Sequence, residues 1–289
     1  MQLHRRNDAD EFAGEVGPFL LAREAEHNLL LGILGGIREE GGPYADVEPY
    51  LAFVRDDAGR VALVAVRTPP HNVVLSTAAT TALVDPLVAD LSRAAVDLPG
   101  VTCPTELAAT FTSRWEEITG RTSALAVSMR IFRASHARHP SGVAGCLRQA
   151  SETDRTIAMA WGRAFEFEAV ANEPDDEQAQ RWADRMLQPN NDRGLVIWEV
   201  DGQPVSMAGY GGPTPNGIRV FAVYTPPPLR RRGYATACVA ALTERLLANG
   251  RRFCFLFTDL ANPTSNAIYQ WIGYRTVLDV DDRRLESTS

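Results

Sequence analysis

Apolar residues recur along this chain with two different periods, and the changes of period predict its elements. Phe12, Val16, Phe19 and Leu20 have helical spacing, and a second helical stretch, AEHNLLLGILGGI, ends on a Gly-Gly pair. Extended runs follow at PYLAFV, VALVAV and NVVLS, separated by turn-forming residues. Two further helices are predicted around a short PGVTCP segment, at TALVDPLVADLSRA and TELAATFTSRWEEITG, before a long strand, SALAVSMRIFRA.

The pattern begins again after a segment of linker-like composition, SHARHPSGVAG. A short strand, GCLRQAS, precedes two predicted helices, SETDRTIAMAWGRAFEFEAV and DDEQAQRWADRMLQ. Three strands follow, GLVIWEV, PVSMAGYGG and IRVFAVYT, with hairpin chemistry at Asp201-Gly202 and Pro215-Asn216-Gly217. The order then continues with a helix from Gly233 to Ala248, a strand FCFLFTD, a helix from Pro263 to Trp271 and a strand YRTVLDV.

Both halves therefore share one order of elements: two helices, three strands, a helix, a strand, a helix and a strand. This repetition predicts an α/β (α+β) fold of two similar domains. We place the first domain at residues 1–135, the linker at 136–144 and the second domain at 145–289. The halves differ after their third long strand, where the first half reads NVVLSTAATTALV and the second reads VYTPPPLRRRGYATA.

The charge of the chain argues against a broad nucleic-acid surface. The formal net charge is −7, and all 29 basic residues are arginines. Residues 1–135 carry 12 arginines against 18 acids, a net −6, and residues 136–289 carry 17 against 18, a net −1. Neither half is basic, so we expect no nucleic-acid partner even though three arginines stand together at 230–232.

Several further expectations follow from what the sequence lacks. The four cysteines show no CxxC pair and no metal-ligand spacing, which favours reduced thiols and no metal site. The first residues, MQLHRRNDADEF, contain no apolar signal region, and no apolar run approaches the roughly 18 residues of a membrane helix. We expect a cytoplasmic protein without a membrane partner, either a monomer or a homodimer.

The stretch PPPLRRRGYATA is the strongest candidate for chemistry. It lies between a predicted strand and a predicted helix, and the N-terminus of a helix offers unpaired N–H groups and a partial positive charge. Gly233 permits a positive φ and a close approach of ligand to backbone, and Ala235 is small. These features favour an anion-binding turn, while an ordinary helix start with solvated arginines remains the alternative.

The spacing Arg230-x-x-Gly233-x-Ala235 resembles the pyrophosphate-binding motif of the GNAT N-acetyltransferase family. A second segment, NPTSNAIYQWIGY, resembles the family's later motif, with Asn262, Tyr269 and Gly273 in place and Tyr274 where phenylalanine is commoner. The resemblance covers about Gly145 to Val280. It implies tandem GNAT-like domains, each with a mixed, mostly antiparallel sheet flanked by helices, in which only the second domain carries the motifs.

The resemblance further implies acetyl-CoA as cosubstrate, with no metal. By this resemblance the pantetheine arm lies along the end of the third strand, and the pyrophosphate lies over the turn. The corresponding cofactor-binding residues are Val223, Tyr224, Thr225, Arg230, Arg231, Arg232, Gly233, Tyr234, Ala235 and Thr236, with Asn262 either touching CoA or only capping its helix. The first half is expected to shape the acceptor site or hold the domains together.

The implied reaction is attack of a primary amine on a thioester, an acyl-CoA-dependent N-acyl transfer. Tyr269 matches the family's general acid, although a tyrosine packed on a helix is the simpler interpretation. The sequence does not identify the general base. The candidates are Glu166, Glu168, Glu199 and Asp259, each of which could equally be an ordinary surface acid. Trp161, Tyr210 and Tyr224 are candidates for an acceptor pocket or for the core.

Three functions remain open on the sequence. The first is an N-acetyltransferase acting on a small-molecule or amino-acid-like amine. The second is a catalytically inactive, CoA-binding regulatory protein, against which the presence of Tyr269 argues. The third is nucleic-acid binding through the arginine triplet, which requires steeply salt-dependent affinity.

Overall fold

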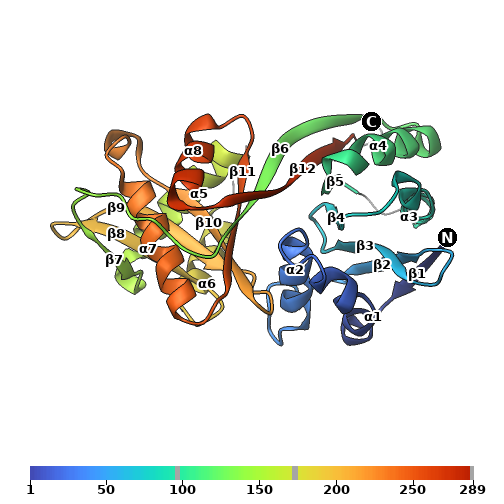
Figure 1. The fold of residues 1–289 in the computed structure, drawn as a ribbon, viewed down its shortest axis with the longest axis horizontal. Coiled ribbons are helices and arrows are strands. Elements are labelled where there is room, and N and C mark those ends of the chain that lie inside the picture. The colour runs from blue at the N-terminus through green and yellow to red at the C-terminus, as the bar shows by residue number, and fades with distance from the viewer. Residues whose placement is uncertain (95–97, 171–174, 287–289) are drawn as a thin grey trace. The chain divides into compact units, whose positions relative to one another are not determined.

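The computed structural model describes residues 1–94, 98–170 and 175–286. These residues fall into two compact units, Met1–Ile131 with Val277–Ser289, and Phe132–Thr276. The sequence placed the whole C-terminal strand in the second domain, whereas the structure assigns Val277 onward to the first unit. The elements of the two halves can be followed by colour in Figure 1.

The first half of the chain forms six strands and four helices, in the order β1 (Gln2–Arg6), α1 (Ala9–Leu21), α2 (Asn28–Arg38), β2 (Tyr50–Arg55), β3 (Val61–Arg67), β4 (Val73–Leu75), a 3₁₀ turn (Thr81–Leu83), α3 (Val84–Arg93), β5 (Gly100–Pro104), α4 (Thr105–Thr119) and β6 (Ser123–Ala134). The second half repeats this order with β7 (Cys146–Gln149), a 3₁₀ turn (Glu152–Asp154), α5 (Arg155–Val170), α6 (Asp176–Met186), β8 (Gly194–Val200), β9 (Gln203–Gly211), β10 (Gly217–Tyr224), a 3₁₀ turn (Pro227–Leu229), α7 (Tyr234–Ala248), β11 (Phe253–Asp259), α8 (Pro263–Ile272) and β12 (Arg275–Leu285). The repeated order predicted from the sequence is confirmed.

The sequence missed β1, the first strand. Its residues, QLHRR, show no apolar alternation, because this short strand lies at the edge of its sheet and pairs only with β2. The predicted hairpin at Asp201-Gly202 is present, and both residues have positive φ, 48° and 75°. Two successive positive φ values are typical of the tight turns that match strand twist.

Each unit contains a mixed, mostly antiparallel sheet. In the first unit β1, β2, β3 and β4 are antiparallel neighbours, β4 and β5 are parallel, and β12 lies between β5 and β6. In the second unit β7, β8, β9 and β10 are antiparallel neighbours, β10 and β11 are parallel, and β6 follows β11. The two halves thus exchange strands, because β12 takes a place in the first unit and β6 reaches the second.

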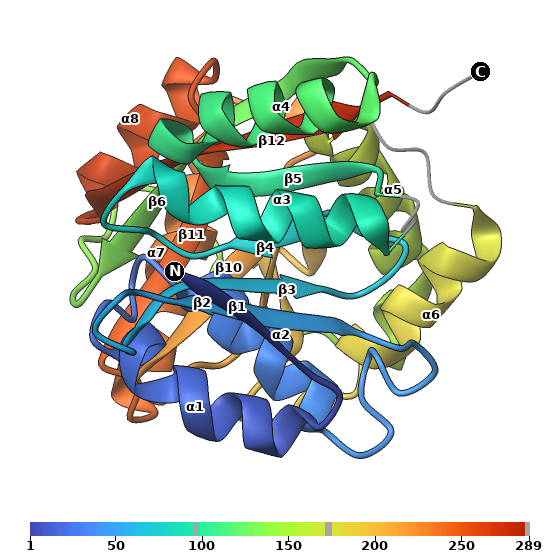
Figure 2. The ribbon, with the colours of Figure 1, turned by 90° about the vertical axis from the view of Figure 1, so that its right-hand side faces the viewer.

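Helices cover both faces of each sheet. In the first unit α1 and α2 pack on one face through Phe12, Val16, Leu20, Leu30 and Leu34, and α3 and α4 pack on the other, as Figure 2 shows. In the second unit α7 and α8 cover one face and α5 and α6 the other. Alternate residues of the central strands enter the two cores, which is the period-2 pattern of a sheet buried on both sides. No helix among the described residues is long and apolar enough to cross a membrane.

The segment between the halves packs on the second unit rather than running free. Residues 135–145 form no helix or strand. The backbone N–H of Arg138 donates to Ile272 O over 2.7 Å, its guanidinium donates to Trp271 O, and Val143 joins the core beneath α7. The segment has the composition of a linker, but its residues pack as part of the second unit.

In the first unit, the buried side chain of His27 accepts a hydrogen bond from the start of the turn that follows β4. The Thr77 N–H donates to Nε2 of the buried His27 over 3.2 Å, so the neutral ring carries its proton on Nδ1, which donates to Leu20 O. Burial, together with the smaller effect of the nearby Arg23 charge, lowers the pKa of His27 from 6.5 to about 4. Protonation would place an N–H of the ring against the N–H of Thr77.

We predict that the stability of the first unit falls as the pH falls from 6.5 to 4. The unfolded chain binds the His27 proton near pH 6.5, while the folded protein binds it near pH 4, so acid favours unfolding. The full shift corresponds to roughly 3 kcal/mol. Urea unfolding at several pH values should show a shallower pH dependence for His27→Gln than for wild type. His71→Gln, at an exposed histidine of the same unit, is the control, and equal slopes for wild type and His27→Gln would contradict the account.

Candidate active site

The parallel strands β10 and β11 pair over only part of their length. Gly217, Ile218 and Arg219 pair with Phe253, Cys254 and Phe255, and no further pairs join the two strands in the described structure. Both strands continue, β10 to Tyr224 and β11 to Asp259. The last residues of β10 therefore have one neighbour, β9, and a backbone edge that is open toward β11.

A β-bulge changes the direction of side chains at the end of β10. Phe221 pairs with Gly209 and Tyr224 with Met207, so β10 has one residue more than β9 here, and Ala222 has a φ of 49°. Ile218 and Val220 enter the core under α7, whereas Ala222 and Tyr224 enter the core under α5. An unbroken strand would keep all four on one face. This bulge could not be predicted from the residue types, because alanine does not favour a positive φ.

The turn after β10 has an unusual backbone. Pro227–Leu229 form a single 3₁₀ turn, Arg231 has a φ of 64° and Gly233 has a φ of 81° immediately before α7. A Cβ at Gly233 would lie 2.9 Å from Val143 Cγ2. Two features therefore favour glycine at position 233: the positive φ of its backbone and the close approach of Val143.

This turn presents several N–H groups together. The N–H groups of Arg231, Arg232 and Gly233 donate no hydrogen bond to the backbone or side chains of the described residues. Tyr234, Ala235 and Thr236 open α7, where helix geometry leaves the first N–H groups without intrahelical acceptors. Successive free N–H groups at a helix start form an anion-binding concavity.

The equivalent turn of the first unit has a different backbone conformation. None of the residues 76–84, all of which the structure describes, has a positive φ. Ser76 Oγ accepts from the Val64 N–H, and the Thr77 N–H is taken by His27. The two turns therefore differ in backbone conformation, and the first N–H groups of the first unit's turn, those of Ser76 and Thr77, are bonded within that unit.

The later motif forms the start and the body of α8. Asn262 caps the helix, its side chain accepting from the Ser265 N–H over 3.0 Å, and Pro263 occupies the first turn. Tyr269 packs between Phe132 and Tyr274, with ring centroids at 6.5 and 6.1 Å. Tyr274 is fully buried, and its hydroxyl bonds the Thr243 hydroxyl over 2.7 Å, which explains how tyrosine is accommodated there.

Comparison with known proteins identifies this unit. The acetyltransferase (GNAT) family matches residues 133–274. Residues 133–274 form a GNAT domain. The match spans the open edge of β10, the turn and α8, so the features described above are those of a GNAT fold.

Solved structures extend the likeness to the whole chain. A Drosophila protein is similar with a TM-score of 0.69 and 12% identity, covering 99% of both chains. A GCN5-related N-acetyltransferase from Sphaerobacter thermophilus has a TM-score of 0.62 and 14% identity over 98% of this chain and 95% of its own. A tandem GNAT protein from the clavulanic acid biosynthesis pathway has a TM-score of 0.56 and 12% identity, covering 100% of both. At such identities the likeness shows the fold alone: a tandem GNAT arrangement. No curated protein matches the sequence.

The three arginines of the GNAT turn have different environments. Arg230, at the motif's first position, donates through Nη2 to both carboxylate oxygens of Glu168 on α5, at 2.7 and 2.9 Å, and through Nε to Thr225 O at 2.8 Å. Among the described residues Arg232 hydrogen-bonds only to Pro228 O, at 3.5 Å. Arg231 makes no such contact with the described residues. The guanidinium of Arg230 thus ties α5 to the turn, and those of Arg231 and Arg232 are the freer charges.

The three residues expected along the pantetheine arm are partly engaged already. Ser206 Oγ donates to Tyr224 O over 3.0 Å, and Thr225 O accepts from Arg230. Burial raises the pKa of the Tyr224 hydroxyl, and the nearby Glu168 charge raises it further. Val223 has neither of these contacts.

The structure separates the four acids considered as bases. Glu199 pairs with Arg148, which also binds Asp154, and Asp259 Oδ1 accepts from the Ala261 N–H in the turn before α8. Glu168 is held by Arg230. Glu166, half-buried on α5, makes no hydrogen bond or ion pair with the described residues. Trp161 packs against Tyr224, at 6.1 Å between centroids, within the core under α5.

The surroundings of Tyr269 favour its protonated form. Although part of its side chain reaches the surface, the protein atoms packed around it raise its pKa to about 12, because a phenolate would be poorly hydrated there. No cluster of three or more His, Cys, Asp or Glu side chains among the described residues is arranged to hold a metal ion.

We predict measurable coupling between Arg230 and Glu168. Both side chains are 42% exposed, so solvent screening limits the coupling energy to about 0.5–1 kcal/mol. A double-mutant cycle with Arg230→Gln and Glu168→Gln, followed by urea unfolding, measures it. The more exposed pair Glu177–Arg181 on α6 is the control and should couple more weakly. Strictly additive effects at positions 168 and 230 would contradict the tie between α5 and the turn.

Proposed function

We propose that this protein is an N-acetyltransferase that moves the acetyl group of acetyl-CoA to a primary amine of a small-molecule or amino-acid-like acceptor. The observation that carries the proposal is the turn before α7. Its positive φ values at Arg231 and Gly233 leave consecutive N–H groups open at the start of a 15-residue helix. A pyrophosphate is an anion of the right kind for such donors.

The proposed position of CoA follows from the order of these features along the chain. The pyrophosphate lies over residues 231–236, with Arg231 and Arg232 adding charge at the mouth of the turn. The pantetheine arm runs along the open edge of β10 past Val223, where it takes the place of a strand partner. The thioester then lies near the bulge at Ala222, whose extra residue interrupts the ladder with β9.

The proposed reaction is direct transfer. The neutral amine attacks the carbonyl carbon, the C–N bond forms as the C–S bond breaks, and the amine proton leaves to solvent or to a base. Tyr269 donates its hydroxyl proton to the departing thiolate. A cysteine thiol has a pKa of about 8.5 in water, and the pKa of Tyr269 is higher, so transfer from Tyr269 to a thiolate is favoured when desolvation makes that thiolate more basic. The apolar packing around Tyr269 provides such a setting.

We predict that Gly233→Val abolishes acetyl-CoA binding. A valine at φ 81° is strained and meets Val143, so the turn must change shape and its N–H groups no longer converge. Isothermal titration with acetyl-CoA measures the loss. Gly202→Val is the matched control, since it places the same residue at φ 75° in a hairpin with open space around it. It should lose similar stability and keep wild-type affinity. Normal binding by folded Gly233→Val would refute the proposed turn.

We predict that Tyr269→Phe lowers turnover by about 10²–10⁴-fold without changing the affinity for acetyl-CoA. Thiol release with a panel of primary amines measures turnover. Because the pKa of Tyr269 is about 12, the hydroxyl stays protonated at ordinary pH, and the ratio of wild-type to mutant rates should be constant from pH 6.5 to 9.5. Tyr274→Phe, which removes a buried hydroxyl bonded to Thr243, is the control and should affect stability rather than turnover. Equal turnover in Tyr269→Phe would exclude Tyr269 as the acid.

A further inference from the structure

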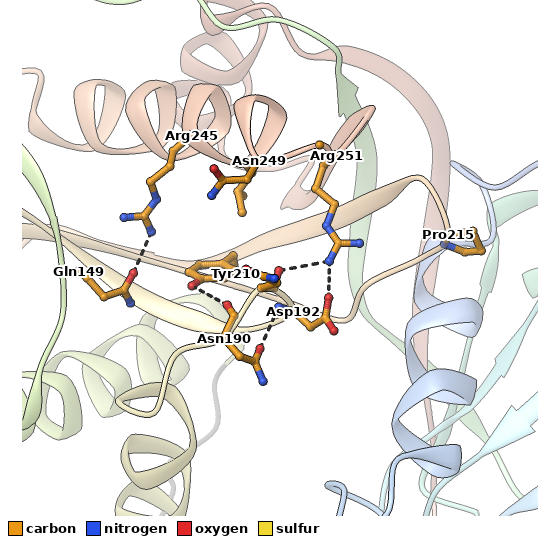
Figure 3. A pocket seen from close by; sticks show the side chains of 11 residues that line it. Gln149, Asn190, Asp192, Tyr210, Pro215, Arg245, Asn249 and Arg251 are labelled. Carbon is orange, nitrogen blue, oxygen red and sulfur yellow. Dashed lines mark hydrogen bonds and ion pairs between the residues drawn. The ribbon is translucent and has the colours of Figure 1, made fainter.

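A polar cavity lies at the opposite end of α7 from the proposed CoA turn. Its volume is about 520 Å³, and its lining comes from the end of β7, the loop before β8, the end of β9 and the C-terminal end of α7. Figure 3 shows Arg245 and Arg251 reaching into it from α7 and the residues beyond. Since a helix rises 1.5 Å per residue, the cavity and the turn are separated by roughly 20 Å along α7. Cavities of this size hold small molecules.

Arg245 carries a positive charge that no carboxylate neutralises among the described residues. Its Nη2 donates to the neutral amide oxygen Gln149 Oε1 over 3.0 Å, and its guanidinium carbon lies 5.8 Å from the centroid of the Tyr210 ring. The side chain is half-buried in the last turn of α7. A guanidinium has five donors, so this environment leaves most of them available to a ligand.

Tyr210 forms the floor of the cavity and is fixed in place. Its hydroxyl donates to Asn190 O over 3.1 Å, and a Cβ at Gly194 would lie 2.5 Å from that hydroxyl. Glycine at 194 therefore allows the ring to lie across the start of β8. Figure 3 shows the ring between Arg245 and the Asn190 loop. The donors of Arg245 thus face a rigid surface.

The second arginine of the lining, Arg251, is already neutralised by a carboxylate and forms one side of the cavity. Arg251 pairs with Asp192 and donates to Asn191 O over 3.2 Å and to Thr214 O over 3.5 Å. Asp192 is the only carboxylate among the described residues of the lining, so these residues carry a net charge of +1, from Arg245. The rest of the lining is rich in amides, with Gln149, Asn190, Asn191 and Asn249. Amides both donate to and accept from hydroxyl groups.

We propose that this cavity binds a small, hydroxyl-rich monocarboxylate, whose carboxylate pairs with Arg245 and whose hydroxyls meet the surrounding amides. A planar guanidinium and a carboxylate form two parallel, charge-assisted hydrogen bonds. The site is separate from the proposed CoA turn, and the proposal does not depend on the acetyltransferase reaction. The structural alternative is that Arg245 only complements the negative end of the α7 dipole.

The test uses gluconate as the probe and sorbitol as its neutral counterpart, which has a hydroxymethyl group in place of the carboxylate. Titration calorimetry is carried out on the full chain in the presence of saturating acetyl-CoA, so that the turn is occupied. We expect one gluconate per chain with a dissociation constant in the millimolar range or tighter, and no saturable binding of sorbitol. Arg245→Gln should weaken gluconate binding at least tenfold, and Arg245→Lys should weaken it less because the charge remains.

Arg252→Gln is the matched control. Arg252 follows Arg251 directly but lies outside the lining, and its change should leave gluconate binding intact. Loss of binding in Arg252→Gln as well as Arg245→Gln, no saturable binding of gluconate to the wild type, or equal binding of sorbitol would each overturn the proposal. Binding of inorganic phosphate in place of gluconate would overturn the choice of a carboxylate. A failure of acetyl-CoA itself to bind would count against the proposed function alone, and the gluconate titration would then be judged without it.

Discussion

The second unit depends on one backbone constraint, the pair of positive φ values that open α7. Arg231 and Gly233 turn the chain so that consecutive N–H groups face outward rather than toward acceptors within the protein. Several other features support this turn: the three prolines that precede it, Val143 packed against Gly233, and Arg230 bonded to Thr225 O. An orientation that costs strain and leaves donors open is typical of a ligand site.

The first unit shows the same fold without that constraint. Its order of elements and the parallel pairing of its fourth and fifth strands are repeated, yet its turn after β4 begins with two bonded N–H groups, Ser76 donating to Val64 O and Thr77 to His27 Nε2. The turn of the first unit has no positive φ, whereas its counterpart in the second unit has two. The two units therefore share a fold but differ in the backbone of this turn.

The sequence predicted the order of elements and the position of the turn because both depend on local signals. Apolar periodicity indicated the helices and strands, and Gly233 with Ala235 indicated the start of α7. The bulge at Ala222 was not predictable, since it arises from pairing with β9, nor was the pair of Arg230 with Glu168, whose partners are 62 residues apart. The strand β1 was missed because its pattern is that of an edge, and the exchange of β12 into the first unit leaves no mark on its sequence. The roles of Tyr269, Asn262 and the turn residues toward CoA stay predictions.

Hydrogen exchange of the backbone amides with and without acetyl-CoA tests the central claim most directly, because the claim concerns N–H groups. The account predicts slower exchange at residues 231–236 when acetyl-CoA is added, and no change at residues 76–82, the equivalent turn of the first unit, which has no positive φ. Unchanged exchange at 231–236 under saturating acetyl-CoA, or protection at 76–82 in its place, would contradict it.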